Sequence, residues 1–275
     1  MTSPSAQPLP SRDRDAGDSP AGNTRDGLSD EELDAAECAF FFDVDGTLLD
    51  IAERPEGVHV PAALVSDLHA LHRRAGGALA LVSGRPVREL DTLFAPLRLP
   101  AAGVHGIELR PDTGAEIDVR APRIDDGLRT AIGAVTNRWR GVFAEDKGVG
   151  LAVHYRAEPD AGPALKHALA DIVAGRDDLA ILPGHMVFEI KPSGHHKGGA
   201  VEALMKRPPF AGRFPVFFGD DVTDEDGFAA ALAAGGTAFA VGRSFPGART
   251  SLSDAAAVRR LVHRLAQAQP AERRI

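Results

Sequence analysis

Two aspartates that could share one chemical task, Asp43 and Asp45, directly follow the aromatic run Phe40–Phe42. This apolar run is too short for a helix and suits a buried strand, along which alternate side chains point the same way. Both carboxylates therefore face one side, where like charges repel unless a cation neutralises them. Oxygen ligands favour Mg²⁺. Beside such a cation, one carboxylate could attack phosphorus while the other transfers a proton.

An Asp-Gly turn at a strand end is the alternative explanation for Asp45 and Gly46. A second acidic group favours the cation. Five acids fall within the seven residues 220–226, after the strand predicted at Pro215–Phe218. A helix N-terminus alone would favour acids at its first positions. Adjacent Asp220 and Asp221 at the strand end are better explained by a bound cation.

Two further segments could hold a phosphate. Ser83-Gly84-Arg85-Pro86 follows the strand predicted at 78–82 and begins a helix, so a hydroxyl and a glycine stand at a helix N-terminus. A plain strand–helix turn is the alternative. Lys197 begins the helix predicted over 197–205, and its point charge suits a phosphate that also faces carboxylates. His195 and His196 precede it, but no further soft ligands lie at zinc spacing, so we reject zinc.

The elements that must position these residues alternate between short buried strands and amphipathic helices. Such alternation predicts an α/β fold with a Rossmann-like parallel sheet, whose ligands bind outside the carboxyl ends of the strands. Residues 109–192 instead alternate between polar and apolar positions, which is typical of an antiparallel sheet with one covered face. We predict a disordered acidic tail with a short helix (1–36), a catalytic core (37–108 and 193–275) and an inserted α+β lid (109–192).

Composition narrows the classes of function. The net charge is 31 minus 39, or −8, and residues 1–37 hold nine acids and three arginines, which is −6 of it. The folded part is thus near neutral, which argues against a nucleic-acid partner. No apolar run is long enough for a membrane span, and no secretory signal is present. We expect a cytoplasmic monomer, in which the lone cysteine, Cys38, is inert packing.

The four motifs together resemble those of the haloacid dehalogenase (HAD) superfamily of aspartate-nucleophile phosphatases. The resemblance implies a HAD core with a C2-type cap. Asp43 would be the nucleophile and Asp45 the general acid and base, while Ser83 and Lys197 would hold the transferring phosphoryl group. It further implies Mg²⁺ held by the Asp43 side chain, the Asp45 backbone carbonyl and the Asp220 side chain. Asp221 and Asp224 would orient the ligand waters and the lysine.

Substrate choice should depend on the lid, because the core motifs are generic. His154-Tyr155-Arg156 ends one alternating strand, and Glu189 and Lys191 share one face of another. Sugar hydroxyls both donate and accept hydrogen bonds, so a carboxylate beside an ammonium suits them. An ordinary polar strand face is the alternative.

Residues 38–265 closely resemble the trehalose-6-phosphate phosphatase family, most specifically in Glu-Ile-Lys-Pro at 189–192 and in the Thr-Asp-Glu of the fourth motif. The resemblance implies hydrolysis of trehalose 6-phosphate, the last step of trehalose biosynthesis. His185 departs from the Lys or Arg of many relatives. Phosphatases of sucrose 6-phosphate or mannosyl-3-phosphoglycerate, and a non-catalytic sugar-phosphate-binding regulator, are the alternatives. The residues expected to contact substrate are Thr47, Gly84, Arg85, Glu108, His154, Arg156, His185, Glu189 and Lys191.

Overall fold

The computed structural model describes residues 33–51, 57–184, 186–246, 248 and 250–268. Most of the predicted tail, including its short helix, and the predicted substrate contact His185 lie outside these residues. Within the described ranges, no helix is both long enough and apolar enough to cross a membrane.

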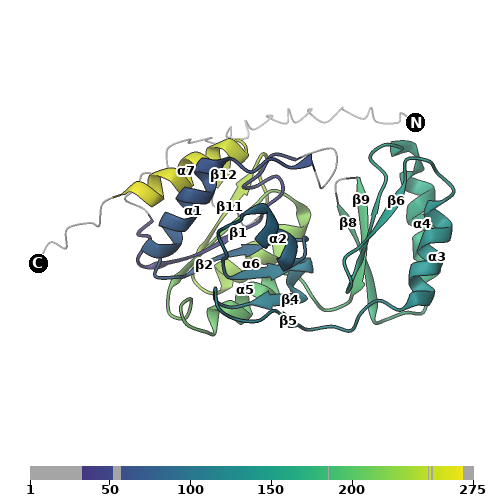
Figure 1. The fold of residues 1–275 in the computed structure, drawn as a ribbon, viewed down its shortest axis with the longest axis horizontal. Helices are drawn as coiled ribbons and strands as arrows, with labels where there is room; N and C mark the ends of the chain where they lie inside the picture. Colours follow the sequence, from purple (N-terminus) through teal and green to yellow (C-terminus); the bar gives the residue numbers. More distant parts are fainter. Residues whose placement is uncertain (1–32, 52–56, 185, 247, 249, 269–275) are drawn as a thin grey trace, which may run out of the picture.

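The larger of two sheets has eight strands and forms the core (Figure 1). In spatial order they are β12 (Thr250–Leu252), β11 (Thr237–Val241), β10 (Phe214–Gly219), β1 (Cys38–Phe42), β2 (Leu79–Val82), β3 (Ala101–Gly103), β4 (Glu108–Arg110) and β5 (Asp118–Val119). The pairs from β12 to β3 are parallel, and β4 and β5 continue the sheet antiparallel. The predicted α/β fold with a mostly parallel sheet is therefore confirmed.

Helices cover both faces of this sheet, which explains why its central strand is apolar throughout. Along β1, Phe40 and Phe42 pack into one hydrophobic cluster and Phe41 into the other. Burial also raises the pKa of the Cys38 thiol to about 12, which keeps it protonated and agrees with inert packing. The first face carries α1 (Ala62–Arg74), α2 (Val87–Leu93) and α7 (Ala255–Gln267), and the second carries α5 (Lys197–Met205) and α6 (Glu225–Ala233).

A smaller antiparallel sheet forms the lid. Its order is β6 (Phe143–Asp146), β7 (Leu151–His154), β9 (Val187–Pro192) and β8 (Leu179–Gly184). Helices α3 (Asp126–Thr136) and α4 (Gly162–Val173) cover the face turned away from the core (Figure 1). Their apolar stripes and the sheet enclose a separate hydrophobic cluster. The other face of the sheet is left to meet the core.

The predicted lid, residues 109–192, includes one strand that belongs to the core sheet instead. The structure has it as β5, which pairs with β4, while β4 pairs with β3 of the core. Alternation of polar and apolar residues identifies a half-exposed strand, but it does not determine which strand pairs with it. The proposed domain boundaries at 108 and 193 stay a prediction. Short 3₁₀ turns in the described ranges include η3 (Val104–Gly106), η4 (Pro159–Ala161) and η5 (Val222–Asp224).

The helix ends follow from capping chemistry. Asp254 rather than the preceding Ser253 caps α7, and its side chain accepts from the N–H of Ala257 at 2.7 Å. Either residue type can fill this position. The inner face of α7 is buried through Val258, Leu261, Val262 and Leu265.

A buried ion pair ties the antiparallel edge of the sheet to α2. The side chain of Arg110 is 1% exposed, and both terminal nitrogens donate to Asp91 at 2.6 Å. Its Nε also donates to the carbonyl of Leu99 at 3.0 Å. Removal of one partner from such a pair leaves a buried charge without compensation.

We therefore expect Asp91→Ala to lower the free energy of unfolding by roughly 2–4 kcal/mol. Urea unfolding at neutral pH measures the change. Asp118→Ala is the matched control, because its partner Arg120 lies 3.4 Å away and the Asp118 side chain is 64% exposed. The control should lose less than about 1 kcal/mol. If both variants lost the same free energy of unfolding, the buried pair of Arg110 and Asp91 would contribute no more to stability than an exposed pair.

Candidate active site

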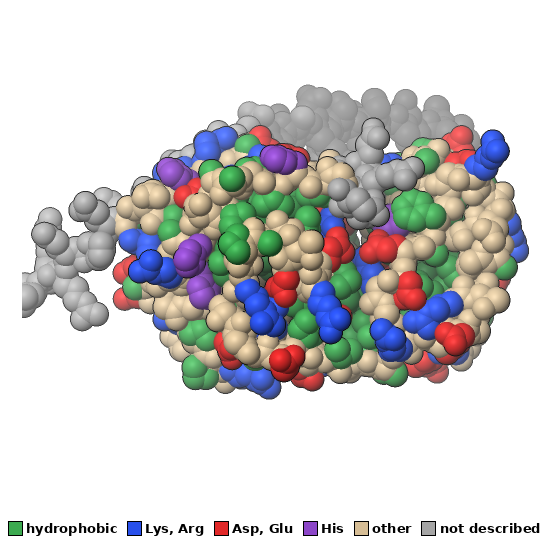
Figure 2. Space-filling view, in the orientation of Figure 1, with side chains coloured by type: hydrophobic (Ala, Val, Ile, Leu, Met, Phe, Trp, Pro, Cys, Tyr) green, Lys and Arg blue, Asp and Glu red, His purple; other side chains and the backbone are tan. Residues whose placement is uncertain are grey.

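The predicted core residues meet at one edge of the parallel sheet. Asp43 follows β1, Ser83 follows β2 and Asp220 follows β10, so the carboxyl ends of three neighbouring strands bring them together. Lys197 enters from the first turn of α5. A cavity of about 720 Å³ opens above them and is lined by core and lid residues. Figure 2 shows acidic and basic side chains gathered along the junction between the core, on the left, and the lid, on the right.

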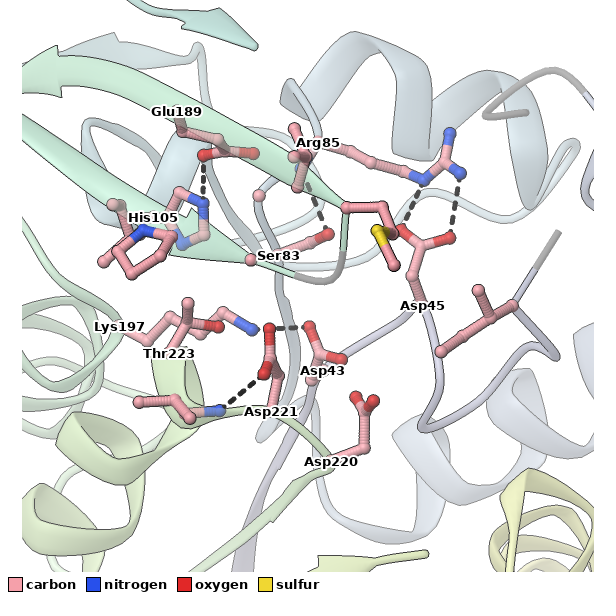
Figure 3. Close-up of a pocket in the computed structure, with 18 of the residues that line it drawn as sticks. Asp43, Asp45, Ser83, Arg85, His105, Glu189, Lys197, Asp220, Asp221 and Thr223 are labelled. Atoms are coloured by element: carbon pink, nitrogen blue, oxygen red, sulfur yellow. Dashed lines mark hydrogen bonds and ion pairs between the residues drawn. The ribbon is translucent and has the colours of Figure 1, made fainter. Parts of the chain in front are cut away.

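Lys197 is the centre of the buried charges. Its Nζ donates at 2.6 Å to Asp43 (Figure 3) and at 2.6 Å to Asp224, and its side chain is 3% exposed. Burial alone would lower the pKa of this ammonium, but the attraction of Asp224 and Asp43 outweighs burial and raises it. Burial, together with the charges of Asp224 and Asp220, holds the pKa of Asp43 well above its usual value despite the lysine.

Asp224 serves as a fixed support rather than as a free acid. One carboxylate oxygen accepts from Lys197. The other accepts from the backbone N–H groups of Asp220 and Asp221 at 3.0 Å each. The Asp221 side chain accepts in turn from the N–H of Val222 at 2.8 Å, and it also accepts from the backbone N–H of Asp224, which completes a capping box. The acidic run is therefore tied down by its own turn.

Three carboxylates form a candidate metal centre. Oxygens of Asp43, Asp220 and Asp224 lie within 4.8 Å of one another. Burial, and next the charge of Asp224, raise the pKa of Asp220 to about 6, so its ionised form lacks sufficient positive charge nearby. Because both oxygens of Asp224 are already bonded, Asp43 and Asp220 are the better direct ligands. These oxygen donors fit a hard divalent cation.

The first and second motifs are joined by an ion pair between Asp45 and Arg85. The Ser83 hydroxyl accepts from the backbone N–H of Arg85 at 3.1 Å. The guanidinium of Arg85 donates from Nε and Nη2 to the two oxygens of Asp45 at 2.6 and 2.8 Å, and from Nη1 to Glu89 (Figure 3). A two-pronged pair of this kind fixes the plane of the Asp45 carboxylate.

The lid supplies a buried carboxylate to the cavity. Glu189 accepts from Lys147 Nζ at 2.8 Å, and its second oxygen lies 2.5 Å from Nε2 of the core residue His105. Burial would raise the pKa of Glu189, but the charges of His105 and Lys147 lower it well below its usual value. Lys147 also donates to the carbonyl of Gly84 at 3.0 Å, so lid and core are joined beside Ser83.

The sequence analysis missed Glu145 and Lys147, which line the cavity from the end of β6 and the turn after it. Glu145 pairs with the predicted residue His154 at 2.8 Å. A signal was present, because these two residues are spaced two apart as Glu189 and Lys191 are. His105, which lies three residues before the predicted contact Glu108, was also not assigned to the site.

Five residues that were predicted to contact substrate line the cavity: Gly84, Arg85, His154, Arg156 and Glu189.

Three described residues predicted to contact substrate do not line it. Thr47 donates to Asp220 at 3.2 Å, and Glu108 accepts from the N–H of Val87 at 2.7 Å at the start of α2. Lys191 donates to the carbonyl of His195. Lys191 does share a strand face with Glu189, but two residues of strand carry it some 6–7 Å further from the hairpin tip. Contact with substrate stays a prediction for all of these residues.

The comparisons with known proteins agree on one family. A family model described as trehalose-phosphatase matches residues 41–253. The chain is 41% identical over 245 residues to a probable trehalose-phosphate phosphatase of Sinorhizobium fredii, covering 88% of this chain and 92% of that protein. It is 42% identical over 209 residues to trehalose-6-phosphate phosphatase of Escherichia coli, covering 76% and 79%. The solved C-terminal domain of trehalose-6-phosphate phosphatase from C. albicans superposes with a TM-score of 0.76 at 25% identity, covering 86% and 93%.

Gly46 allows Asp220 to approach the first motif. Its φ is +89°, and a Cβ there would lie 2.1 Å from the Asp220 carboxylate. We expect Gly46→Ala to weaken Mg²⁺ binding at least about tenfold by displacing Asp220, as calorimetric titration would measure. Gly212→Ala is the control, because its φ is +79° and no atom lies within 4 Å of the added carbon. Equal affinities in the two variants would contradict this role of Gly46.

The titration of Asp220 gives a dependence on pH. Its pKa of about 6 exceeds the ordinary 3.8. The folded state therefore binds this proton more tightly than the unfolded state, and the stability of the metal-free protein falls as pH rises from about 4 to 6. Because a cation must displace the proton, Mg²⁺ should raise Tm more at about pH 7.5 than at about pH 5. Asp220→Asn should abolish the difference between the Tm shifts at the two pH values. Equal Tm shifts at the two pH values in the unsubstituted protein would contradict this role of Asp220.

Proposed function

Because this chain belongs to the trehalose-phosphatase family of the HAD superfamily, we propose that it hydrolyses trehalose 6-phosphate to trehalose and phosphate, the last step of trehalose biosynthesis. One observation carries the proposal from the structure. Asp43 is buried between the ammonium of Lys197 and the carboxylate of Asp220, at the floor of a cavity whose other wall belongs to the lid. A buried carboxylate with cationic neighbours can attack a phosphate ester.

The first chemical step is attack of an Asp43 oxygen on phosphorus. A bond forms between that oxygen and phosphorus, and the bond from phosphorus to the sugar oxygen breaks. Asp45 gives its proton to the departing sugar oxygen, which leaves as a hydroxyl. Lys197 and the Ser83 hydroxyl face the phosphoryl oxygens, over which the charge is spread in the transition state.

The second step regenerates the enzyme. Asp45, now ionised, takes a proton from a water molecule whose oxygen attacks the aspartyl-phosphate. The bond between phosphorus and the Asp43 oxygen breaks, and phosphate leaves. Before substrate enters, both Asp45 oxygens accept from Arg85, at 2.6 and 2.8 Å, which favours the ionised carboxylate. Arg85 must therefore release one of these oxygens before Asp45 can carry the proton that the first step requires. Uncatalysed hydrolysis of phosphate monoesters is very slow, so the site must supply roughly 20 kcal/mol or more.

Mg²⁺ is the cation that this donor set suits best. Asp43 and Asp220 would hold it through their side chains, and Asp45 through its backbone carbonyl. When bound, it supplies positive charge that neutralises the two acids and the phosphate oxygens. Asp224 keeps Lys197 and the turn at 220–221 in place through the hydrogen bonds described above.

The lid side of the cavity suits the sugar. Acidic and basic side chains both line it, namely Glu189, Lys147, Glu145, His154 and Arg156. Such a wall offers both acceptors and donors to hydroxyl groups. The cavity of about 720 Å³ also lies within the usual range of ligand pockets.

The alternatives are another sugar phosphatase, acting on sucrose 6-phosphate or mannosyl-3-phosphoglycerate, and a regulator that binds sugar phosphates without hydrolysis. The family match disfavours the first, and the complete set of core residues disfavours the second. A monomeric state and a cytoplasmic location stay predictions.

Phosphate release from a panel of sugar phosphates tests the function. We expect trehalose 6-phosphate to be the preferred substrate, with activity that requires Mg²⁺ and is lost in chelator. Asp43→Asn should lower turnover by about a thousandfold or more, because the nucleophile is removed. Asp50→Asn is the control, because the Asp50 side chain is 77% exposed and pairs with Arg259. Preference for another sugar phosphate, or retained turnover in Asp43→Asn, would contradict the proposal.

A further inference from the structure

A turn between the core and the lid has an unfavourable backbone. Three successive residues, Val104, His105 and Gly106, have positive φ angles of 46°, 53° and 93°. Glycine adopts this region readily, whereas a β-branched valine rarely does. Val104 is 1% exposed and His105 is 6% exposed. Buried residues keep such a conformation only where their surroundings require it, and these sites are often functional.

The backbone of this turn is bonded to the loop that carries Ser83. The N–H of His105 donates to the carbonyl of Ser83 at 3.0 Å, and the N–H of Val104 donates to the carbonyl of Arg85 at 3.1 Å. The Val104 side chain packs against Val149, which lies in the turn between β6 and β7 of the lid. The turn therefore touches the phosphate side of the site and the lid together.

Among the described residues, the side chain of His105 has one polar partner. Its Nε2 lies 2.5 Å from an oxygen of Glu189 (Figure 3), whose other oxygen accepts from Lys147. The other ring nitrogen, Nδ1, is buried and has no hydrogen-bond partner in the described part of the chain. Gly84 leaves room for this arrangement, since a Cβ there would lie 2.8 Å from Nε2. Within the described ranges, the imidazole thus makes its one polar contact with Glu189.

We propose that His105 is a positioning residue for substrate specificity, which fixes the lid carboxylate Glu189 in the orientation that accepts hydroxyl groups of the sugar. This inference rests on the function proposed above. Held by one donor from the core and one from the lid, the carboxylate has a single orientation, and its remaining lone pairs are available to the cavity. A carboxylate ordered before binding loses no rotamer freedom when the sugar arrives.

The test compares two substitutions at this position. Asparagine tolerates the left-handed backbone, but its amide is too short to reach Glu189. Glutamine extends its amide nitrogen to about the place of Nε2. We expect His105→Asn to lower kcat/KM for trehalose 6-phosphate about 10- to 100-fold, mainly through KM, and to lower its ratio to kcat/KM for p-nitrophenyl phosphate at least about tenfold. His105→Gln should recover most of that ratio.

A double-mutant cycle separates positioning from a purely structural role. If His105 acts through Glu189, adding His105→Asn to Glu189→Gln should lower kcat/KM by less than about twofold beyond Glu189→Gln alone. His263→Asn is the matched control on α7, because that side chain is 60% exposed and pairs with Asp67 away from the cavity. It should leave both substrates unaffected.

Equal losses on both substrates, or full additivity in the cycle, would overturn the proposal. Should His105→Asn fail to fold, proton NMR of the whole chain decides. The Nε2–H signal of His105 should lie far downfield in the unsubstituted protein and should shift in Glu189→Gln. Absence of that shift would also overturn the proposal. If the unsubstituted protein does not hydrolyse trehalose 6-phosphate, the proposed function itself fails. An active protein with an unchanged ratio in His105→Asn contradicts only the role of His105.

Discussion

The ammonium of Lys197 between Asp43 and Asp224 is the interaction on which the active site depends. Three carboxylates meet here with one buried ammonium, so full ionisation leaves a deficit of two positive charges. Lys197 and the backbone N–H groups that bind Asp224 satisfy one of the acids completely. What remains is Asp43 beside Asp220, and burial, together with the charge of Asp224, raises the pKa values of both. A divalent cation held between them would complete the charge balance.

Parallel strands make this concentration of charge possible. Each acid stands just beyond the end of a strand that is buried on both faces, so hydrophobic packing of the strands, rather than attraction among the acids, brings the carboxylates together. Gly46 then provides the space into which the Asp220 carboxylate fits. Hydrophobic packing of the core thus offsets the repulsion between like charges that lie close together. Unfavourable local interactions of this kind are often found at functional sites.

For the same reason, the strand ends of the core could be predicted from the sequence, whereas the contacts between core and lid could not. Asp43, Ser83 and Asp220 each follow an apolar run directly, so the local sequence gives both the strand and the chemistry at its end. Glu145, Lys147 and His105 acquire their roles only when distant segments meet across the cavity. The pairing of β4 and β5 could not be predicted either. Alternation of polar and apolar residues shows which face of a strand is buried, but not which strand lies beside it. Glu108 and Lys191 look suitable for a sugar in sequence, yet their nearest partners are backbone groups.

The loop of the second motif is bonded to the core and to the lid. Three successive carbonyls of this loop each accept a hydrogen bond: Ser83 from the N–H of His105, Gly84 from Lys147 and Arg85 from the N–H of Val104. Two of these donors belong to the core and one to the lid. The loop that presents the Ser83 hydroxyl is therefore fully bonded only when Lys147 of the lid is in place, and Lys147 is held there by Glu189. Under the proposal that the sugar binds against Glu189, its binding would stabilise the same contacts that order this loop, and would favour reaction of the complete substrate over a bare phosphate ester.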